Sequence, residues 1–255
     1  MLPEPVPGDD AKPVADLPEV RRTDSARSRL TAAVSPEEAV VLQLQSAHLV
    51  ERTTPDGFAP KIAAGLDVAY TPDSDRLVAA AVCVDIATLA TVDSVVVRDV
   101  AGFPYIPGLF AFRELPALIP ALDRLTVEPD VLVCDGQGLA HPRRFGLACH
   151  VGVLTGLPTI GVGKQALGRY EPPGPDRGDW KPLVDNGETV GRALRTQHGV
   201  KPVFVSIGHR IDLDTACDLV LRLSPEYRLP ETTRAADHLG REVSAGRVRV
   251  QDVGD

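Results

Sequence analysis

The apolar positions of this chain form short runs whose character changes near the middle of the sequence. Three extended runs come first. They are rich in β-branched residues and separated by short polar breaks, which predicts antiparallel hairpin strands. Their sequences are KIAAGLDVAY (61–70), RLVAAAVCVDI (76–86) and TLATVDSVVVRDV (88–100). The second half instead alternates apolar runs with helical stretches, a pattern that predicts parallel strands joined by crossover helices.

Helices are predicted on both sides of this change. Ser35 is a natural N-cap for a helix over 35–52, because a proline follows it at the first helical position and acids fill the first turn. The helix expected over 109–125 contains Pro116 and Pro120, which predict a bend or a restart. Further helices are predicted over 143–156, 213–223 and 233–246.

The strands expected in the second half are short. They are DVLVCDG (130–136), PTIGVGK (158–164) and PVFVSIG (202–208). Residues 169–182, RYEPPGPDRGDWKP, are dense in Pro and Gly and are predicted to form a surface loop. These patterns alone support an α/β fold class.

Length and composition predict a single domain. The 255 residues have 44% hydrophobic content, enough for one large core. Residues 1–34 are rich in Pro, Asp, Ala and Arg without apolar periodicity, so we expect a disordered N-terminal tail without a site and a catalytic domain over 35–250. The sequence contains no secretory signal and no apolar stretch of membrane-spanning length. The four cysteines form no CxxC pair, which predicts reduced core thiols in a cytoplasmic protein and argues against a zinc site.

The charge of the chain is unevenly distributed. A net charge of −8 argues against a polyanionic partner, because affinity for nucleic acid comes mostly from Lys and Arg. Between Gly136 and Arg210, however, ten Lys and Arg stand against five Asp and Glu, a local net charge of +5. This basic middle is compatible with a groove for nucleic acid. A solvated surface of mixed charge is the alternative.

Three acids stand at the edges of apolar runs: Asp67 in AGLDVAY, Glu114 in FRELPAL and Asp135 in DVLVCDGQG. Burying an unpaired carboxylate costs about several kcal/mol, so an acid at the tip of an apolar strand favours a nearby cation. Mg²⁺ prefers carboxylate oxygens and retains several waters. The three acids together therefore predict a magnesium site. For any one of them a helix cap or a turn is the alternative, since Asp before Gly is a common turn signal.

Longer motifs accompany these acids. They are PYIPG, FRE, DGQGLAHPRRFGLACHVG, PTIGVGK, SIGHR and ETTRAAD. In content and order they are similar to those of the endonuclease V family of inosine-directed nucleases, and the resemblance extends from about residue 35 to 245. It implies a ribonuclease H-like mixed sheet, in which three antiparallel hairpin strands are followed by parallel strands and helices flank the sheet.

The resemblance also implies a reaction. The expected enzyme is a Mg²⁺-dependent endonuclease, with Mn²⁺ able to substitute, whose substrate is DNA containing deoxyinosine and in some members RNA containing inosine. It hydrolyses the second phosphodiester bond 3′ to the lesion, leaves a 3′-hydroxyl and a 5′-phosphate, and initiates repair of deaminated adenine. Asp67, Glu114 and Asp135 are the implied direct or water-mediated metal ligands. Asp237 looks like the fourth polar position of the family. Whether one or two ions act stays open, and the expected oligomeric state is a monomer.

Two further polar residues are candidates for the same chemistry. Lys164 is expected to orient the nucleophile or neutralise the scissile phosphate, because its amine is a compact charge on a flexible stem. A phosphate-binding P-loop is excluded, since Pro158 occupies the required first Gly position and Gln165 the Ser/Thr position. The family more often has alanine where Gly163 stands here. His141 in GLAHPRR is expected to contact the phosphate or position a water, with a surface hydrogen bond as the alternative.

The PYIPG segment is interpreted as a wedge. Taking a base out of a duplex costs about a few kcal/mol, and apolar side chains can fill the gap that the base leaves. Tyr105 offers a flat face for stacking, Ile106 and Pro107 fill space, and Gly108 completes the segment. A tight turn that packs its tyrosine on the core is the alternative.

The expelled base requires a pocket. Glycines allow close backbone approach, so Gly136, Gly138 and Gly152, with the adjacent His150, are pocket candidates, and ordinary helix packing is an equal alternative. Hypoxanthine lacks the exocyclic amine of guanine, so a tight fit with backbone donors and acceptors could exclude guanine. Two other functions are considered: a catalytically idle inosine-binding or structural RNA-associated protein, and an unrelated metal-dependent hydrolase or RNase. The intact acids and Lys164 argue against the first, and the wedge segment against the second.

Overall fold

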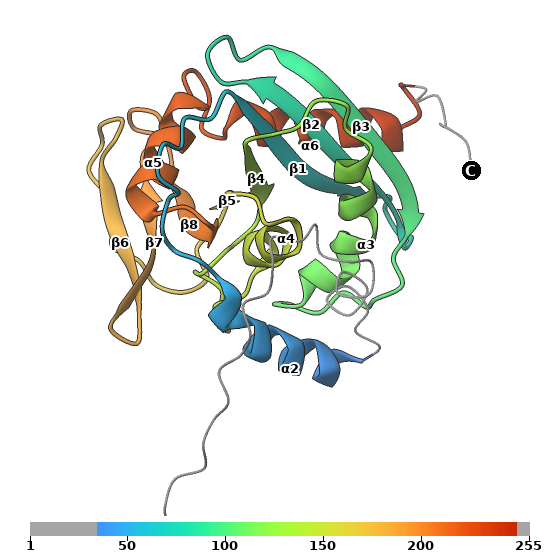
Figure 1. The fold of residues 1–255 in the computed structure, drawn as a ribbon, viewed down its shortest axis with the longest axis horizontal. Coiled ribbons are helices and arrows are strands. Elements are labelled where there is room, and N and C mark those ends of the chain that lie inside the picture. The colour runs from blue at the N-terminus through green and yellow to red at the C-terminus, as the bar shows by residue number, and fades with distance from the viewer. Residues whose placement is uncertain (1–34, 249–255) are drawn as a thin grey trace, which may run out of the picture.

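A single eight-stranded sheet forms the centre of the molecule (Figure 1), which a computed structural model describes over residues 35–248. The tail predicted over 1–34 lies outside the described residues. The strand order is β3-β2-β1-β4-β5-β8-β7-β6. The strands are β1 (Ile62–Tyr70), β2 (Arg76–Asp85), β3 (Thr91–Val100), β4 (Val131–Asp135), β5 (Thr159–Gly163), β6 (Trp180–Asp185), β7 (Glu188–Leu194) and β8 (Val203–His209).

The first five strands confirm the predicted architecture. β1, β2 and β3 form two consecutive antiparallel pairs, as their hairpin pattern predicted. β4 then pairs with β1 in parallel, and β5 pairs with β4 in parallel. Because the parallel strands run in the same direction, the ends of β4 and β5 that carry Asp135 and Gly163 lie at one edge of the sheet.

The other end of the sheet differs from the prediction in two respects. β8 is antiparallel to β5, although the alternating pattern predicted a parallel strand there. The chain reaches β8 from β5 through the antiparallel hairpin β6–β7 instead of a crossover helix, and this route reverses the direction of β8. The predicted surface loop 169–182 is therefore partly wrong, since its last residues begin strand β6.

Helices cover both faces of the sheet (Figure 1). α3 (Phe110–Asp123) and α4 (Leu147–Thr155) pack on one face, in a core that includes Leu66, Leu132 and Leu154. α5 (Leu213–Arg222) and α6 (Glu231–Ser244) pack on the opposite face. The first turn of α6 approaches β1 so closely that a Cβ atom at Gly65 would lie 2.1 Å from the Thr232 carbonyl oxygen. This contact brings α6 directly over the strand that carries Asp67.

Helix boundaries follow the local sequence. α2 (Pro36–Ser46) begins at Ser35 with a capping box, in which the serine hydroxyl and the Glu38 carboxylate each accept a backbone N–H. A 3-10 turn (Ala47–Leu49) follows it. α3 continues through both of its prolines without the predicted restart, and the buried side chains of Leu115 and Leu118 pack it against the sheet.

Two compositional predictions can be compared with the fold. All four cysteines are buried and unbonded to one another, as predicted for core thiols. Within residues 35–248, no helix is long and apolar enough to cross a membrane.

Candidate active site and its relatives

A cavity of about 410 Å³ opens where β4 and β5 end. Its wall combines the end of the sheet with the start of α3, the loop after β4 and the segment before α3. Seven residues singled out from the sequence line it: Pro107, Gly108, Glu114, Asp135, Gly136, His141 and Lys164. The sheet topology thus gathers side chains that are far apart in the sequence.

The carboxyl groups of Asp67 and Asp135 lie side by side at this edge of the sheet. Asp67 is on β1 and Asp135 ends the neighbouring β4, which places the two groups within hydrogen-bonding reach of each other. Burial, together with the negative charge of Asp135, raises the pKa of Asp67 to about 8. Asp237 on α6 adds further negative charge near Asp67. Such a pair retains a proton near neutral pH unless a cation balances its charge.

Glu114 approaches the same edge from α3. The Tyr70 hydroxyl donates a hydrogen bond to its Oε1 atom at 3.1 Å. Burial raises the pKa of Glu114 to about 7, although this hydrogen bond opposes the shift. Glu114 is therefore a buried acid held in place by a residue three positions after Asp67 on β1.

The acids do not form a closed metal cage in the arrangement described. Within residues 35–248, no three His, Cys, Asp or Glu side chains converge closely enough to hold one ion. Each acid has a partner within the protein: Tyr70 for Glu114, Lys164 for Asp135, and Arg241 for Asp237. The three-ligand set inferred from the sequence therefore stays a prediction, and Asp67 and Asp135 are the two acids already in contact.

Lys164 is the first residue after β5. Its Nζ atom forms an ion pair with Asp135, and this carboxylate raises the pKa of Lys164 although burial opposes the effect. The main chain beside it is also held, because Arg228 donates to the Lys164 carbonyl oxygen at 2.6 Å and Gln137 donates to that of Gln165 at 3.0 Å. A compact positive charge is thus fixed next to the paired carboxylates.

The predicted wedge lies beside the cavity. Tyr105 has 67% of its surface exposed, and its ring packs against Phe110 with 4.9 Å between ring centroids. Ile106 packs on an apolar cluster that includes Phe103 and Leu109. The tight-turn alternative requires this tyrosine to pack on the core. The exposed position of Tyr105 does not agree with that alternative.

Gly108 ends this segment with a left-handed backbone that favours glycine, and its carbonyl group accepts several hydrogen bonds. Its φ angle is +83°, and a Cβ atom there would lie 2.9 Å from an Arg143 nitrogen. Its carbonyl oxygen accepts hydrogen bonds from Arg143 at 2.8 Å, from His141 at 2.9 Å and from Gln43 at 3.1 Å. The segment that carries Tyr105 is thus tied to α2 and to the loop after β4.

His141 supports this segment through both ring nitrogens. Nδ1 accepts the Arg143 backbone N–H at 3.2 Å, so Nε2 carries the proton that is donated to the Gly108 carbonyl oxygen. Burial, reinforced by Arg143, lowers the pKa of His141 to about 4. The ring is therefore neutral and both of its nitrogens are engaged by the backbone, and its expected contact to a phosphate or a water stays a prediction.

Three of the four predicted pocket residues, Gly138, His150 and Gly152, do not line the cavity. Gly138 packs against β8, where a Cβ atom would lie 2.0 Å from the Ile207 carbonyl oxygen. His150 is buried in α4 between Phe112 and Phe145, with ring centroids 5.1 and 5.0 Å apart. Gly152 in α4 is also closely packed, since a Cβ atom there would lie 2.4 Å from the Cβ atom of His209. Of the four pocket candidates, Gly136 alone lines the cavity.

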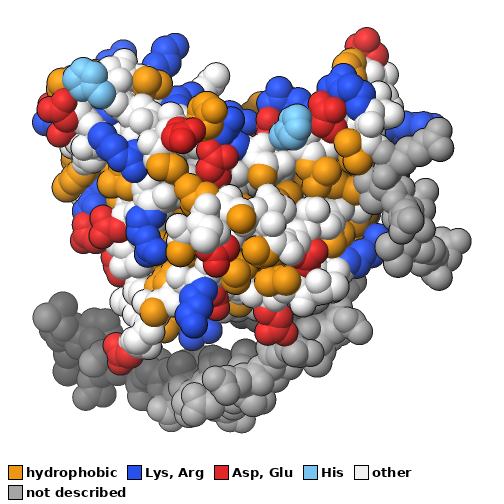
Figure 2. Space-filling model, turned by 90° about the horizontal axis from the view of Figure 1, so that it is seen from above, with side chains coloured by type: hydrophobic (Ala, Val, Ile, Leu, Met, Phe, Trp, Pro, Cys, Tyr) orange, Lys and Arg blue, Asp and Glu red, His pale blue; other side chains and the backbone are white. Residues whose placement is uncertain are grey.

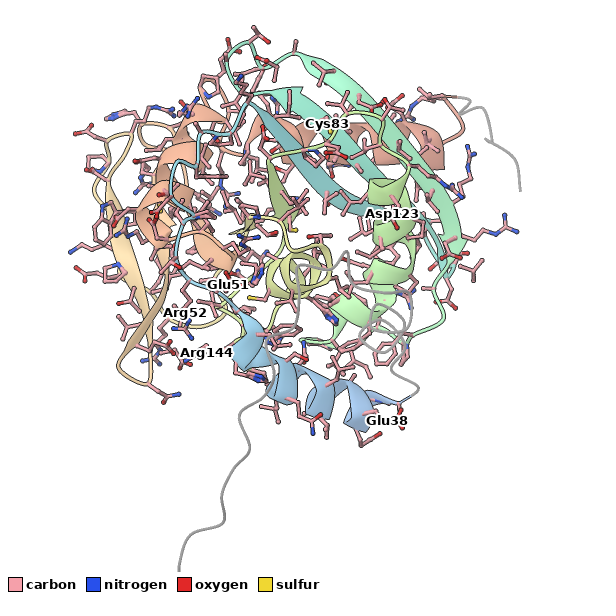
Figure 3. All side chains as sticks on the ribbon, viewed as in Figure 1. Glu38, Glu51, Arg52, Cys83, Asp123 and Arg144 are labelled. Atoms are coloured by element: carbon pink, nitrogen blue, oxygen red, sulfur yellow. The ribbon has the colours of Figure 1, made fainter. Side chains whose placement is uncertain are left out.

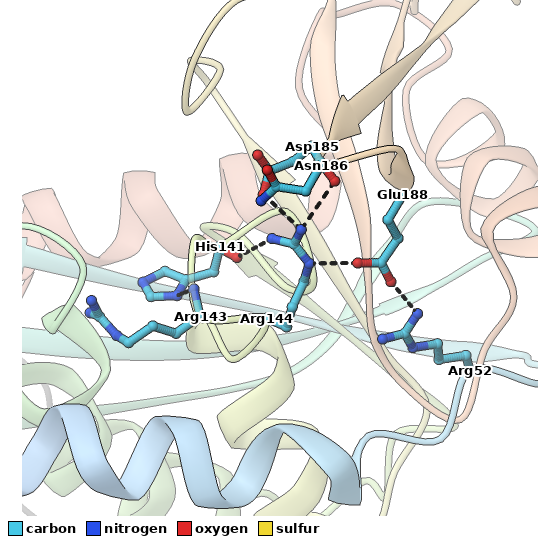
Figure 4. A network of polar contacts seen from close by, with 7 residues as sticks. All are labelled: Arg52, His141, Arg143, Arg144, Asp185, Asn186 and Glu188. Atoms are coloured by element: carbon cyan, nitrogen blue, oxygen red, sulfur yellow. Dashed lines mark hydrogen bonds and ion pairs between the residues drawn. The ribbon is translucent and has the colours of Figure 1, made fainter.

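Arg144 connects the cavity loop to the far end of the sheet (Figure 4). It binds the Asp185 carboxylate at 2.7 Å and that of Glu188 at 2.8 Å, and Arg52 binds the other oxygen of Glu188 at 2.6 Å. Figure 3 shows Arg52 and Arg144 close to the end of α2. This network joins the loop that contains His141 to the hairpin β6–β7.

The surface charge is mixed on the face drawn in Figure 2. Basic and acidic side chains are interspersed there instead of being gathered by sign. On that face the mixed-charge alternative describes the molecule, and the basic groove stays a prediction.

With the geometry in place, the chain can be compared with known proteins. The sequence model of the family described as endonuclease V matches residues 43–238. The chain belongs to the endonuclease V family. It is accordingly a nuclease that acts on phosphodiester bonds.

Individual relatives agree with this assignment. Endonuclease V of Nocardia farcinica is 54% identical over 216 residues, which are 84% of this chain and 95% of the relative. The crystal structure of endonuclease V from Streptomyces avermitilis superposes with a TM-score of 0.80 at 52% identity and covers 84% of this chain and 95% of its own. That of Ciona intestinalis, in complex with a 24mer DNA containing an inosine followed by a ribo-adenosine, gives a TM-score of 0.74 at 25% identity and covers 83% of this chain and 98% of its own.

Several residues of the site were not singled out from the sequence. Tyr70 holds Glu114, Gln43 holds Gly108, and Arg228 holds the main chain of Lys164. Each acts through a partner distant in the sequence, so no local pattern marks it. Arg143 is different, because it stands inside the long motif that contains His141, and that position could have marked it as a functional residue.

Proposed function

We propose that this member of the endonuclease V family is a divalent-metal-dependent nuclease that recognises inosine in DNA and cuts the same strand nearby. The observation that carries the proposal is the paired carboxyl groups of Asp67 and Asp135 facing Lys164 at the rim of the cavity. The complex of the Ciona intestinalis relative with inosine-containing DNA supports the choice of substrate.

The donor set suits a hard cation such as Mg²⁺ or Mn²⁺. Asp67 and Asp135 present carboxylate oxygens, and the raised pKa of Asp67 reflects its burial together with the negative charge of Asp135 beside it. Asp67 and Asp135 would hold the ion, with Glu114 and Asp237 within electrostatic reach of this pair. When bound, the ion supplies an activated water and stabilises the charge that develops on the phosphate.

The other polar side chains have roles of their own. Lys164 neutralises the scissile phosphate, because its amine already lies against the carboxylates where that phosphate would dock. Tyr70 keeps the Glu114 carboxyl in one orientation. His141 keeps the wedge segment against the cavity wall through Gly108. We assign it this positioning role in place of a phosphate contact.

The cavity is the proposed receptor for the extruded base. A volume of about 410 Å³ falls within the range of small-ligand sites, which is about 300–1,000 Å³. Tyr105 stands exposed beside it, where it can stack on the bases that remain. We further propose that cleavage occurs at the second phosphodiester bond 3′ to the lesion, leaving a 3′-hydroxyl and a 5′-phosphate. This reaction would begin repair of deaminated adenine by a monomeric enzyme.

The first prediction concerns Asp67. We expect Asp67→Asn to abolish Mg²⁺-dependent nicking of an end-labelled strand with a single inosine, because the neutral amide binds a cation weakly. Binding to the uncut strand, measured without metal, should persist. The assay reports the cut position, and its use on RNA as well as DNA decides the preferred nucleic acid. Cleavage retained by Asp67→Asn would refute the role of Asp67 as a metal ligand. If the parent protein bound the strand without cutting it, the protein would be a catalytically idle inosine-binding protein.

The second prediction concerns the wedge. Tyr105→Ala should weaken binding to an inosine duplex more than binding to the same single strand, because only the duplex requires a stacking partner for the gap. Loss of base stacking should cost about 1–3 kcal/mol in the duplex. Fluorescence anisotropy with both substrates measures the difference. Equal losses in the two would argue against strand separation by this segment.

A further inference from the structure

Arg228, in the segment between α5 and α6, contacts the main chain of Lys164, the proposed catalytic lysine. Its Nη2 atom donates to the Lys164 carbonyl oxygen at 2.6 Å and to that of Pro202 at 2.9 Å. Its Nε atom donates to the Lys201 carbonyl oxygen at 3.0 Å. One half-buried guanidinium therefore joins the main chain of Lys164 to the residues that precede β8.

The position of this clamp matters because the sheet ends just before Lys164. β5 and β8 remain paired as far as Gly163, which lies opposite Phe204. Beyond that pair the β5–β8 ladder provides no further support for the chain. Arg228 begins its contacts at the next residue, and its planar fork of donors fixes carbonyl groups in direction as well as in distance. Arg228 therefore holds the main chain of the residue whose amine pairs with Asp135.

A second arginine makes a similar clamp elsewhere. Arg195 follows directly after β7, is half-buried and donates to the carbonyl oxygens of Pro173, Gly174 and Val200. None of these three residues lines the cavity. Arg195 is thus a matched control for the structural effect of removing a three-carbonyl clamp.

We propose that Arg228 is a positioning residue for the reaction: its bond to the Lys164 carbonyl oxygen fixes the lysine amine against Asp135, where the scissile phosphate docks. The inference rests on the proposed nuclease function for its kinetic consequence. The position of the amine itself can be measured without any reaction.

The kinetic test uses single-turnover nicking of a strand that contains one inosine, at saturating protein and Mg²⁺. Arg228→Met should lower the rate by about 10- to 100-fold, the loss expected when a catalytic group is misplaced by about 1 Å. Arg195→Met should nick at the parental rate, even if both variants melt at lower temperature. Binding of the uncut strand without metal should be unchanged in both.

A double variant distinguishes positioning from a general structural role. If Arg228 acts through Lys164, adding Arg228→Met to Lys164→Met should lower the nicking rate by no more than about twofold, since residues that act as a unit are non-additive. A full second loss in the double variant would overturn the proposal. It would mean that Arg228 acts on Asp135, on the substrate or on the fold independently of the lysine.

Chemical labelling gives a readout that needs no activity. The Lys164 and Lys181 side chains are each 40% exposed and each ion-paired with a carboxylate, so Lys181 is an internal reference. In Arg228→Met, limited acetylation followed by mass spectrometry should show about two- to fivefold faster labelling of Lys164, as an ion pair of modest strength is lost. Labelling of Lys181 should not change, and Arg195→Met should alter neither lysine. Unchanged Lys164 labelling would overturn the proposal, whereas a parent that labels as expected but never nicks would refute only the proposed function.

Discussion

At the scale of single residues, the neighbours of each acid in the site determine its orientation and its charge, and so its capacity to bind a cation. Glu114 is a buried carboxyl group with one hydroxyl donor, Tyr70, and the Arg113 guanidinium lies 5.2 Å from the centre of the tyrosine ring. The tyrosine is thus fixed from one side while it orients the acid on the other. Partners that orient a metal-binding group commonly change metal affinity or activity by about 10- to 100-fold when they are removed.

We therefore expect Tyr70→Phe to raise the Mg²⁺ concentration for half-maximal nicking by about tenfold, because Glu114 loses the hydrogen bond that orients it. A Mg²⁺ titration of the nicking rate measures this shift. Strand binding in the presence of a chelator should be unaffected. Tyr227→Phe, which also removes one hydroxyl from a tyrosine packed against an arginine, serves as the control. An unchanged titration curve for Tyr70→Phe would show that the hydroxyl has no part in holding Glu114.

Sequence patterns located the acids more readily than the residues that hold them. Asp67, Asp135 and Lys164 each border a buried apolar run of a strand, and a charged group in that setting is visible in the sequence itself. Their holders are not, because Arg228 reaches Lys164 across 64 positions and only the folded chain makes them neighbours. His141 illustrates the converse case. Its motif marked it as important, but the contacts of its ring could be learned only from the fold.

At the scale of elements, the hairpin strands and the helices were predictable, whereas the far edge of the sheet was not. Strand β6 is an edge strand that is exposed along most of its length and contains Pro182, so its sequence resembles a loop. Because the sequence pattern indicates neither β6 nor β7, it predicts a crossover from β5 to β8 and the wrong direction for β8. Alternation of apolar runs identifies strands, but the connection between two strands decides whether they are parallel.

Helix α2 gives a prediction at this scale, because one of its buried side chains, Gln43, hydrogen-bonds to two other segments of the chain. Gln43 donates to the carbonyl oxygens of Gly108 and Phe145 and accepts a hydrogen bond from Arg143 at 2.6 Å. Gln43→Ala leaves a half-buried arginine donor and the Phe145 carbonyl oxygen without these bonds, so the free energy of unfolding should fall by about 2–3 kcal/mol. Urea unfolding measures the loss. Gln45→Ala on the exposed face of the same helix should change stability by less than about 0.5 kcal/mol. Similar values for the two variants would mean that α2 does not depend on this side chain for docking.

At the scale of the whole molecule, stability and catalysis make opposite demands on the carboxyl groups. Burial favours the neutral form of Asp67 and Glu114, raising their pKa values to about 8 and about 7, whereas cation binding requires the charged form. The folded protein without metal therefore holds protons that its unfolded chain would release. A bound divalent cation would remove this conflict by balancing the carboxylates. As the pH rises, metal affinity should therefore increase while the stability of the metal-free fold decreases.

This linkage has a definite sign. An unfolded aspartate titrates near a pKa of about 3.9, and Asp67 in the folded protein near about 8. Between these values the folded state binds the extra proton, so the contribution of Asp67 to stability is complete below about pH 4 and is lost as the pH rises through about 8.

Asp67→Asn keeps the shape of the neutral acid and cannot ionise. In a chelator, it should melt above the parent at pH 8.5, by about 2–4 °C for each kcal/mol gained, and equally with it at pH 4. Differential scanning calorimetry at the two pH values tests this, and Asp218→Asn on the exposed face of α5 should shift neither. Mg²⁺ added at pH 8.5 should raise the melting temperature of the parent but not that of Asp67→Asn. If Asp67→Asn were less stable than the parent at pH 8.5, the buried carboxyl group would have to be charged and already neutralised by Lys164.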